Sequence, residues 1–538
     1  MRIFNQKLWG DVFFYLTIAF GVYVFLPQLD TYGLVASGDQ GICLYAFDRT
    51  LHGEMPYKDY LWIYGPLLPF YYAFFLKIFG INMLSILKGQ VLFKFLSGIF
   101  IFLTLRTLSF SFIGFAGALW FYVFRHNFFY TYNHDGGIFV LTIFLWMIAS
   151  YIRYQRNGYL WLALFCAFIL ALIKINIGAV AGGVLLLTVI LTDFLQGIKW
   201  APGKKKFYIA AIGILPITVA AIYSFLLRGL SWVEINQCLP YFGAYQPYHI
   251  SLFAAVVNRF LRLLRDVLTD PRQLFFTMTV IFSFVRTIQM IRNKQSSLKE
   301  RNMAILIVVI FGVYYALNLH EYLMSGVWYR GYWTEPVGIV WMFSVIAMGL
   351  KRFNGIIRGV IVGIIVLIAV VSQGANTKEV KDIHRTEHYM DDPRAKIFIQ
   401  NDADWIKTVQ DTTGFLNLIL APNETFFAFP YDPLYYYLAN RKSPTRLLNF
   451  IEMNHVTSQQ EVGIIQDLER NHVNFILLTN RIRSHASDIG YFGVTYSRIL
   501  AKYMAEKFVP VKSFGNWDNE GGYQASHATL ILRRKEPL

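Results

Sequence analysis

Charged side chains are scarce in this sequence. Asp, Glu, Lys and Arg make up 15% of its 538 residues, whereas ordinary soluble domains carry about a quarter. By contrast, 56% of the residues are hydrophobic and 17% are aromatic. Such a chain has more apolar surface than a water-soluble core can bury, and its apolar residues form long runs. We therefore exclude a soluble protein and expect a polytopic membrane protein.

Paired cysteines are also lacking. Cys43, Cys166 and Cys238 show no spacing typical of a disulfide framework or a zinc site. The sequence contains no nucleic-acid-binding module either, although its formal net charge is +16. Lys and Arg lie mostly between the apolar runs, where orientation signals belong. We therefore expect membrane lipid, and no nucleic acid, as a partner.

The apolar runs predict the membrane-spanning segments. A helix needs about 20 residues to cross the hydrocarbon core, and by this measure the sequence has about 11 spans. The first run is longer than that of a signal peptide and lacks a small-residue cleavage site, so we expect a retained helix. Residues 65–80 form a shorter apolar helix, which we place at the membrane interface. The predicted spans lie near 8–27, 83–105, 108–124, 136–152, 158–174, 177–196, 207–227, 273–291, 303–319, 333–349 and 355–373.

The basic residues predict the orientation of the chain. With the N-terminus in the cytoplasm, the inside loops are basic and nearly free of acids, as the positive-inside rule expects. The odd number of spans then places residues 376–538 outside. One outside loop breaks the rule, because it carries Arg259, Arg262 and Arg265. Their spacing predicts an interfacial helix that contacts lipid phosphates, with substrate contact as the alternative.

The C-terminal part differs in character from the rest. Residues 376–538 are far more polar, and short apolar runs alternate with amphipathic stretches. We expect an extracytoplasmic α/β domain here, following a membrane domain of residues 1–375. Predicted strands lie at 415–420, 425–429, 473–478 and 529–532, and predicted helices at 459–471 and 494–508.

Two acidic residues stand at the predicted outer ends of the spans. Asp39 lies in the first outer loop, residues 28–64, which is dense in acids, aromatics and turn residues. Its carboxylate can act as a general base or bind a metal, or it can cap a helix in a solvated loop. Asp135 follows Asn133 and His134 at the start of the fourth span. It either caps that helix or faces the same cavity as Asp39.

Two cations lie near the same predicted surface. Ionisable groups at this depth are costly, so each needs a reason. Lys174 sits at the turn between two apolar helices, where it either snorkels to the interface or binds a phosphate. Arg330, in segment 329–332, can bind a phosphate through both arms of its guanidinium group. It can equally pair with Glu321 or Glu335 as a structural bridge.

These motifs resemble the GT-C superfamily of membrane glycosyltransferases, especially the branch of protein O-mannosyltransferases and lipid A aminoarabinose transferases. The most similar part is the first loop, where Asp39 is followed by residues 46–57 and by an aromatic-Gly-Pro helix start. The resemblance extends over residues 8–350. The other similar positions are Asn133-His134-Asp135, Lys174 with Gly178, and Arg330-Gly331-Tyr332.

The resemblance implies both a fold and an activity. The fold is a polytopic α-helical membrane domain followed by a C-terminal soluble α/β domain. The activity is transfer of a sugar from a polyprenyl-phosphate donor to an acceptor hydroxyl on the extracytoplasmic face, with inversion at the anomeric carbon. The phosphate is the leaving group, so nearby cations fit this chemistry. A bacterial-type inner (plasma) membrane is implied, and the acceptor is a glycan, a lipid or a protein.

The resemblance also implies roles for single residues. Asp39 is the expected catalytic base, and Asp135 is expected on the acceptor side. Both are the expected ligands if a divalent metal takes part, which the sequence leaves open. Lys174 and Arg330 are expected to hold the donor phosphate. Acceptor contacts, or contacts that support the catalytic groups, are expected from His134, Glu321 and Asp48.

The sequence departs from the family in its first loop. Relatives often have Asp-Glu where this chain has Asp39-Gln40, and many carry a cation before the proline that is Pro66 here. We consider Lys58 as the substitute for that cation. Two other functions remain open: a transporter or flippase of lipid-linked sugars, and a non-catalytic protein of envelope assembly. Broken helices with a charge pathway near the midplane are typical of a transporter.

Overall fold

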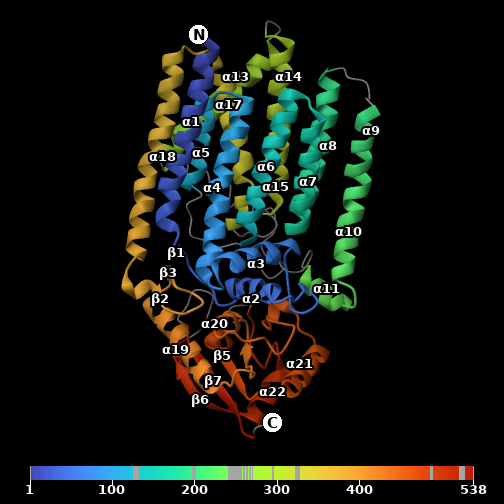
Figure 1. The fold of residues 1–538 in the computed structure, drawn as a ribbon, viewed down its shortest axis with the longest axis vertical. Helices are drawn as coiled ribbons and strands as arrows, with labels where there is room; N and C mark the ends of the chain where they lie inside the picture. Colours follow the sequence, from blue (N-terminus) through green and yellow to red (C-terminus); the bar gives the residue numbers. More distant parts are fainter. Residues whose placement is uncertain are drawn as a thin grey trace.

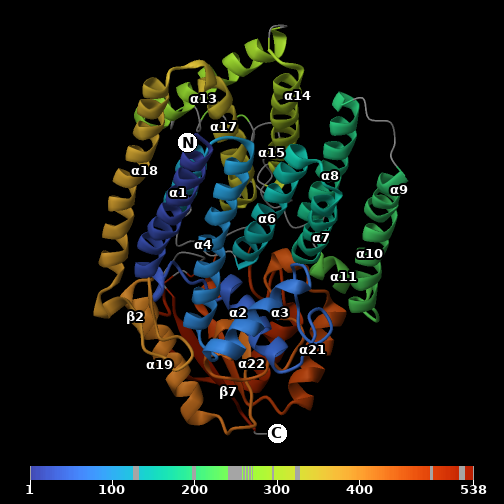
Figure 2. The same ribbon diagram turned by 45° about the horizontal axis from the view of Figure 1, so that its top comes forward.

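The chain folds into a bundle of long helices with a smaller α/β region at one end. The N-terminus lies at the opposite end of the bundle from this region (Figures 1 and 2). Arg259 and Arg262, from the predicted interfacial helix, lie outside the residues that the structure describes. This computed structural model describes residues 2–124, 132–196, 202–239, 257, 261, 265, 268–269, 271–293, 296–321, 328–484, 489–519, 521 and 527–536.

The bundle consists of apolar helices, since a helix satisfies its own backbone hydrogen bonds where water is absent. Helix α4 packs against both α5 and α6. Short π-helical turns connect α9 to α10 and α14 to α15. The helices are α1 (Arg2–Phe25), α4 (Met83–Leu108), α5 (Ser111–Phe124), α6 (Tyr132–Tyr154), α7 (Asn157–Ile173), α8 (Ile175–Gln196), α9 (Pro202–Ile209), α10 (Leu215–Leu226), α13 (Pro271–Arg292), α14 (Leu298–Leu306), α15 (Gly312–Asn318), α17 (Glu335–Gly349) and α18 (Gly355–Ile383).

The predicted spans correspond to these helices. Within the described residues, 8 helical segments are long and apolar enough to cross a membrane, judged by length and composition. Three further predicted spans coincide with the shorter apolar helices α5, α7 and α17. The chain is thus a multi-pass helical protein, and the exact number of spans stays a prediction. The predicted boundary at residue 375 falls inside α18, which continues to Ile383.

Two helices lie across the end of the bundle, between it and the α/β region (Figure 1). Helix α3 (Leu67–Phe79) follows Pro66, and its bounds lie within the apolar helix predicted at residues 65–80. Helix α2 (Asp39–Leu51) was not predicted from the sequence. Its residues 40–48 are all buried. A helix covered on every side shows no polar face and therefore no apolar period of 3.6 residues. Part of the expected first loop is thus a buried helix.

The C-terminal region contains a four-stranded mixed sheet in the order β4-β5-β7-β6. Strand β5 pairs parallel to β4 and antiparallel to β7. Three predicted strands and both predicted helices are present in this region. The elements are α19 (Ala403–Ile419), β4 (Phe427–Phe429), α20 (Leu434–Leu438), α21 (Ser458–Arg470), β5 (Phe475–Thr479), α22 (Arg498–Lys507), β6 (Phe508–Phe514) and β7 (Thr529–Arg534).

One prediction for this region was wrong, and one strand was missed. The expected strand at 415–420 is the last part of α19, whose buried residues Ile406, Val409 and Leu416 follow helical spacing. Strand β6 was missed because it is an edge strand with a mostly exposed surface. An exposed edge lacks the apolar alternation by which a strand is found.

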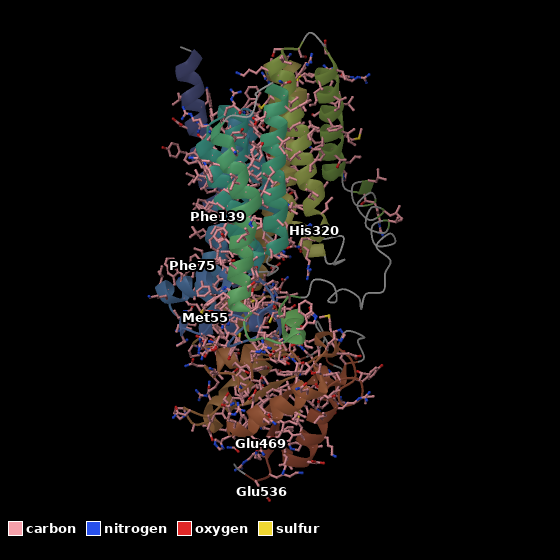
Figure 3. All side chains as sticks on the ribbon, turned by 90° about the vertical axis from the view of Figure 1, so that its right-hand side faces the viewer. Met55, Phe75, Phe139, His320, Glu469 and Glu536 are labelled. Carbon is pink, nitrogen blue, oxygen red and sulfur yellow. The ribbon has the colours of Figure 1, made fainter. Side chains whose placement is uncertain are left out.

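A second, small sheet joins the first loop, residues 28–64, to the C-terminal region. Strand β1 (Thr31–Tyr32) pairs in parallel with β3 (Ile397–Ile399), and β2 (Tyr389–Met390) pairs antiparallel with β3. The Asn401 side chain then clamps the Val35 backbone, accepting a hydrogen bond from its N–H at 2.7 Å and donating one to its C=O at 2.9 Å. Figure 3 shows Met55 near the same junction, with Glu469 and Glu536 farther out.

A buried ion-pair cluster ties α2 to this region as well. Asp48 is 2% exposed, and its carboxylate contacts the guanidinium groups of Arg394 at 2.6 Å and Arg49 at 2.8 Å. Arg394 also lies over the ring of Tyr437, 4.5 Å from its centroid. Loss of Arg394 would remove the shorter of the two contacts and leave the buried carboxylate with Arg49 alone, and weakening a buried ion pair in this way is destabilising.

We therefore expect Arg394→Gln to lower stability by about 3 kcal/mol. The measurement is the thermal unfolding of the detergent-solubilised full chain, followed by size-exclusion recovery. The matched control is Arg470→Gln, because Arg470 pairs with Asp467 at an exposed site, where an ion pair contributes about 1 kcal/mol or less. Equal melting temperatures for the two variants contradict the prediction.

Candidate active site

Asp39 stands in the first turn of α2, and its side chain is exposed. The favourable end of the helix dipole therefore stabilises its negative charge. This turn packs closely against residues 431–434 of the C-terminal region. A Cβ on Gly38 would come within 2.5 Å of the Tyr431 ring, and one on Gly41 would overlap Leu434. The glycines on either side of Asp39 thus permit a close approach that larger residues would block.

The closest partner of Asp39 comes from the C-terminal region. The Tyr431 hydroxyl donates a hydrogen bond to Asp39 Oδ1 at 2.8 Å. Burial, with the neighbouring Asp39 charge, raises the pKa of Tyr431 well above its usual value. The phenol therefore stays protonated and acts as the donor.

Segment 64–66 brings the first loop to the end of α7. The Gly65 N–H donates to the Ile173 carbonyl at 2.9 Å. A Cβ on Gly65 would overlap the backbone of Leu172 and Ile173, so only glycine fits here. This contact places Tyr64 beside the turn that carries Lys174. The residue before Gly65-Pro66 is thus a tyrosine close to the Lys174 turn.

Lys174 lies in the one-residue break between α7 and α8. Gly178 permits this tight hairpin, because a Cβ there would overlap Ala171. The Lys174 ammonium pairs with Glu321 and lies 5.9 Å from the centroid of the Trp333 ring. The pKa of Lys174 is lowered from its ordinary value, mainly by burial. The Glu321 carboxylate opposes this shift, and the positive charge of Arg330 adds to it. Lys174 therefore points into a polar cluster, unlike a lysine that snorkels to water.

Glu321 is the centre of this cluster. Its side chain is 4% exposed, and it also accepts a hydrogen bond from the Asn176 amide at its second oxygen. Asn176 contacts His320 Nε2 at 2.9 Å, and His320 lies 3.6 Å from Glu321. Glu321 thus has Lys174 as an ion-pair partner, and the pairing of Arg330 with Glu321 or Glu335 stays a prediction.

Arg330 connects this cluster to Asp39. It lies in the 3-10 turn η5 (Trp328–Trp333). Burial lowers the pKa of Arg330, and the nearby Asp39 carboxylate opposes this effect. Arg330 is also the positive neighbour that acts on Lys174. Arg330 is thus within electrostatic range of both Asp39 and Lys174.

Asp135 lies in the first turn of α6 and is 3% exposed. Its Oδ2 accepts a hydrogen bond from the Gln90 amide of α4 at 3.0 Å. The ring of His134 meets the Trp333 ring edge-on, with centroids 5.3 Å apart. These contacts connect the start of α6 to α4 and to η5. Their geometry is that of supporting residues rather than of an accessible acid.

The structure does not bring two predicted site residues to this cluster. Asp48 lies nine positions beyond Asp39, about 13 Å along α2, in the ion-pair cluster with Arg394. Lys58 is exposed in the turn between Pro56 and Tyr60. Its side chain makes no ion pair with the residues that the structure describes. Functional roles for both residues stay predictions.

A divalent metal was left open by the sequence. Among the described residues, no three His, Cys, Asp or Glu side chains form a group that could hold a metal ion. Asp39 instead faces Tyr431, and Asp135 faces Gln90. A metal held by Asp39 and Asp135 therefore stays a prediction.

Sequence reasoning missed Tyr431, Tyr64 and Asn176. Tyr64 could have been noticed because it precedes Gly-Pro, and Asn176 because it follows Lys174 by two positions. Tyr431 lies in the turn-rich stretch Phe-Pro-Tyr-Asp-Pro. No local pattern connects that stretch to the first loop, so its contact with Asp39 emerges only from the fold.

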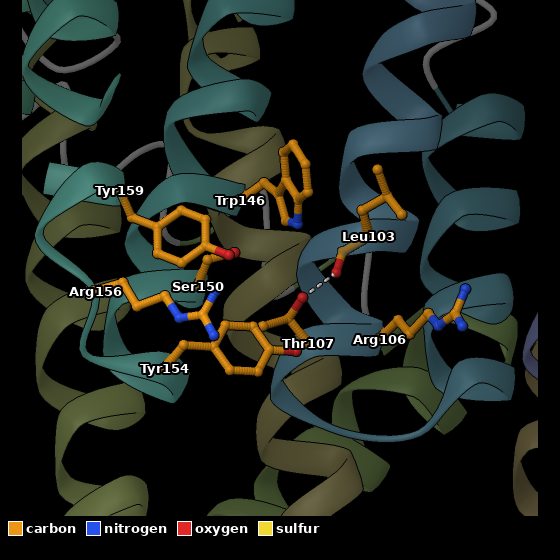
Figure 4. Close-up of a pocket in the computed structure, with 8 residues that line it drawn as sticks. All are labelled: Leu103, Arg106, Thr107, Trp146, Ser150, Tyr154, Arg156 and Tyr159. Atoms are coloured by element: carbon orange, nitrogen blue, oxygen red, sulfur yellow. Dashed lines mark hydrogen bonds between the residues drawn. The ribbon is translucent and has the colours of Figure 1, made fainter. Parts of the chain in front are cut away.

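A pocket of about 440 Å³ lies at the other end of the same helices. Arg156 extends toward the rings of Tyr154 and Tyr159, whereas Arg106 points away from them (Figure 4). Basic and aromatic side chains are typical of a membrane–water interface. Because α6 carries Asp135 at its start and Tyr154 at its end, this pocket is separate from the Asp39 site.

No family model and no curated protein sequence matches this chain. Solved structures do share its architecture. ArnT from Cupriavidus metallidurans in the apo state aligns with a TM-score of 0.57 at 12% identity, covering 98% of each chain. The apo oligosaccharyltransferase of Archaeoglobus fulgidus aligns with a TM-score of 0.51 at 12% identity, covering 89% of this chain and 70% of that one. The chain is therefore a multi-pass helical membrane protein that shares the fold of these two proteins, in agreement with the fold expected from its resemblance to the GT-C superfamily.

Proposed function

We propose that this protein is an inverting membrane glycosyltransferase that moves a sugar from a polyprenyl-phosphate donor to an acceptor hydroxyl. The acceptor is a glycan, a lipid or a protein on the extracytoplasmic face of a bacterial-type plasma membrane. The GT-C fold supports the kind of activity, since the oligosaccharyltransferase and ArnT share it. The observation that carries the proposal is the convergence of an exposed carboxylate, Asp39, with Arg330 and Lys174.

Asp39 is the base in this proposal. Its exposed carboxylate takes the proton of the acceptor hydroxyl while the acceptor oxygen attacks the anomeric carbon. The new C–O bond forms on the face opposite the phosphate, so the configuration inverts. The bond between the anomeric carbon and the phosphate oxygen breaks, and polyprenyl phosphate leaves with the electron pair. No other reactant is needed to balance the step.

Arg330 and Lys174 stabilise the leaving phosphate. A guanidinium group matches a phosphate through two parallel hydrogen bonds, so Arg330 is the main contact. Lys174 already pairs with Glu321, and the phosphate competes with that carboxylate for it. Positive charge placed where negative charge develops lowers the barrier of the transfer. A transporter is not favoured, because these charged groups gather at one end of the bundle.

Asp39→Asn is expected to reduce transfer by at least about 100-fold, because the amide cannot take the proton. The assay follows transfer from a panel of polyprenyl-phosphate-linked radiolabelled sugars in membranes that contain the protein. Asp404→Asn is the matched control, since Asp404 is also exposed in the first turn of a helix, α19. Undiminished transfer by the Asp39 variant rejects this residue as the base.

Arg330→Gln is expected to weaken binding of polyprenyl phosphate by about tenfold or more, because a charge-assisted contact with phosphate is lost. Arg330→Lys keeps the charge without the planar fork and should give an intermediate affinity. Binding of polyprenyl phosphate to the purified protein is measured by native mass spectrometry. Arg228→Gln, an exposed arginine just beyond α10, is the control. Equal affinities for the Arg330 and Arg228 variants contradict the assignment.

A further inference from the structure

The proposed base has a partner from a distant part of the chain. Tyr431 lies 392 positions beyond Asp39 in the sequence, yet its hydroxyl donates to Asp39 Oδ1 at 2.8 Å. The tyrosine is 4% exposed, whereas the aspartate is exposed. One carboxylate oxygen therefore faces the C-terminal region, and Oδ2 is the oxygen left to receive a proton.

A buried network holds Tyr431 in place. Asp432, which is wholly buried, accepts a hydrogen bond from the Thr479 hydroxyl at 2.6 Å. It also lies 3.8 Å from Arg481 Nε. The Arg481 guanidinium lies over the Tyr431 ring, 5.9 Å from its centroid. The end of strand β5 thus fixes both the backbone beside Tyr431 and the face of its ring.

The same network reaches the segment that precedes Asp39. The Ser37 hydroxyl donates to Asp432 Oδ1, and the Arg481 guanidinium donates to Ser37 Oγ at 3.3 Å. The Leu434 N–H donates to the Ser37 carbonyl at 3.2 Å. Both ends of the hydrogen bond between Tyr431 and Asp39 are therefore held by one set of buried polar groups. Buried hydrogen-bond networks restrict the motion of the groups that they join.

We propose that Tyr431 is a positioning residue that orients the Asp39 carboxylate for proton abstraction. This inference rests on the proposed function, in which Asp39 is the base. An exposed aspartate has several staggered rotamers available, and the hydrogen bond from Tyr431 selects one of them. Oδ2 is then directed to the acceptor hydroxyl, and its proton moves to that oxygen. The C-terminal region is consequently a part of the active site rather than a separate appendage.

The test compares two tyrosine variants in the full chain. Tyr431→Phe removes only the hydroxyl, and we expect kcat to fall about tenfold while the KM values for donor and acceptor stay unchanged. The control is Tyr503→Phe, which also removes a hydroxyl from the C-terminal region. Tyr503 donates to Glu469 at 2.6 Å, and it is not among the contacts of Asp39. This variant should keep the wild-type kcat.

A spectroscopic measurement tests the hydrogen bond without any substrate. A fluorotyrosine at position 431 of the detergent-solubilised protein should change its ¹⁹F resonance when Asp39→Asn is introduced, and not with Asp404→Asn. An unchanged resonance overturns the inference. So does a Tyr431→Phe variant that is as active as Tyr503→Phe while Asp39→Asn is inactive. Wild-type activity in Asp39→Asn instead rejects the proposed function itself, so the two failures are distinguishable.

Discussion

The docking of the first loop, residues 28–64, onto the C-terminal region is the constraint on which the rest of the site depends. A long surface loop has many conformations of similar energy, and ordering it costs about 1–2 kcal/mol per residue. Here strand β1 pairs with β3, Asn401 clamps Val35, and Asp432 binds Ser37. These contacts offset the conformational entropy that is lost when the segment leading to Asp39 is ordered. The exposed carboxylate therefore stands on a rigid support, as a catalytic group requires.

The cations of the site come from the other side of the same junction, where the bundle helices end. Lys174 is held by the tight hairpin of α7 and α8, and Arg330 by η5. A buried cation without compensation is costly, which explains why Glu321 accompanies Lys174. Under the proposed function, a donor phosphate takes over part of that compensation when it binds. The acid and the cations thus belong to different structural units, and the junction between the units is where a sugar transfer can be carried out.

Much of the fold could be predicted because the relevant patterns are local. Apolar runs of the length of a membrane helix identified the bundle, and alternating patterns identified strands β4, β5 and β7. Helix α2 escaped prediction since it is buried on every side, and β6 escaped since its edge is exposed. The stretch at 415–420 was assigned to a strand because a short apolar run is compatible with both structures. Each miss therefore reflects an environment that the local pattern does not record.

The sequence by itself determined which ionisable groups exist and that Asp39, Lys174 and Arg330 lie between the apolar runs or at their ends. Only the tertiary structure decided their partners: Lys174 with Glu321, 147 positions away, and Asp39 with Tyr431. It also separated Asp48 from the site by pairing it with Arg394. The physical reason is the short range of these interactions. Hydrogen bonds and ion pairs act over a few ångströms in space, and no periodicity along the chain encodes which distant residues come that close.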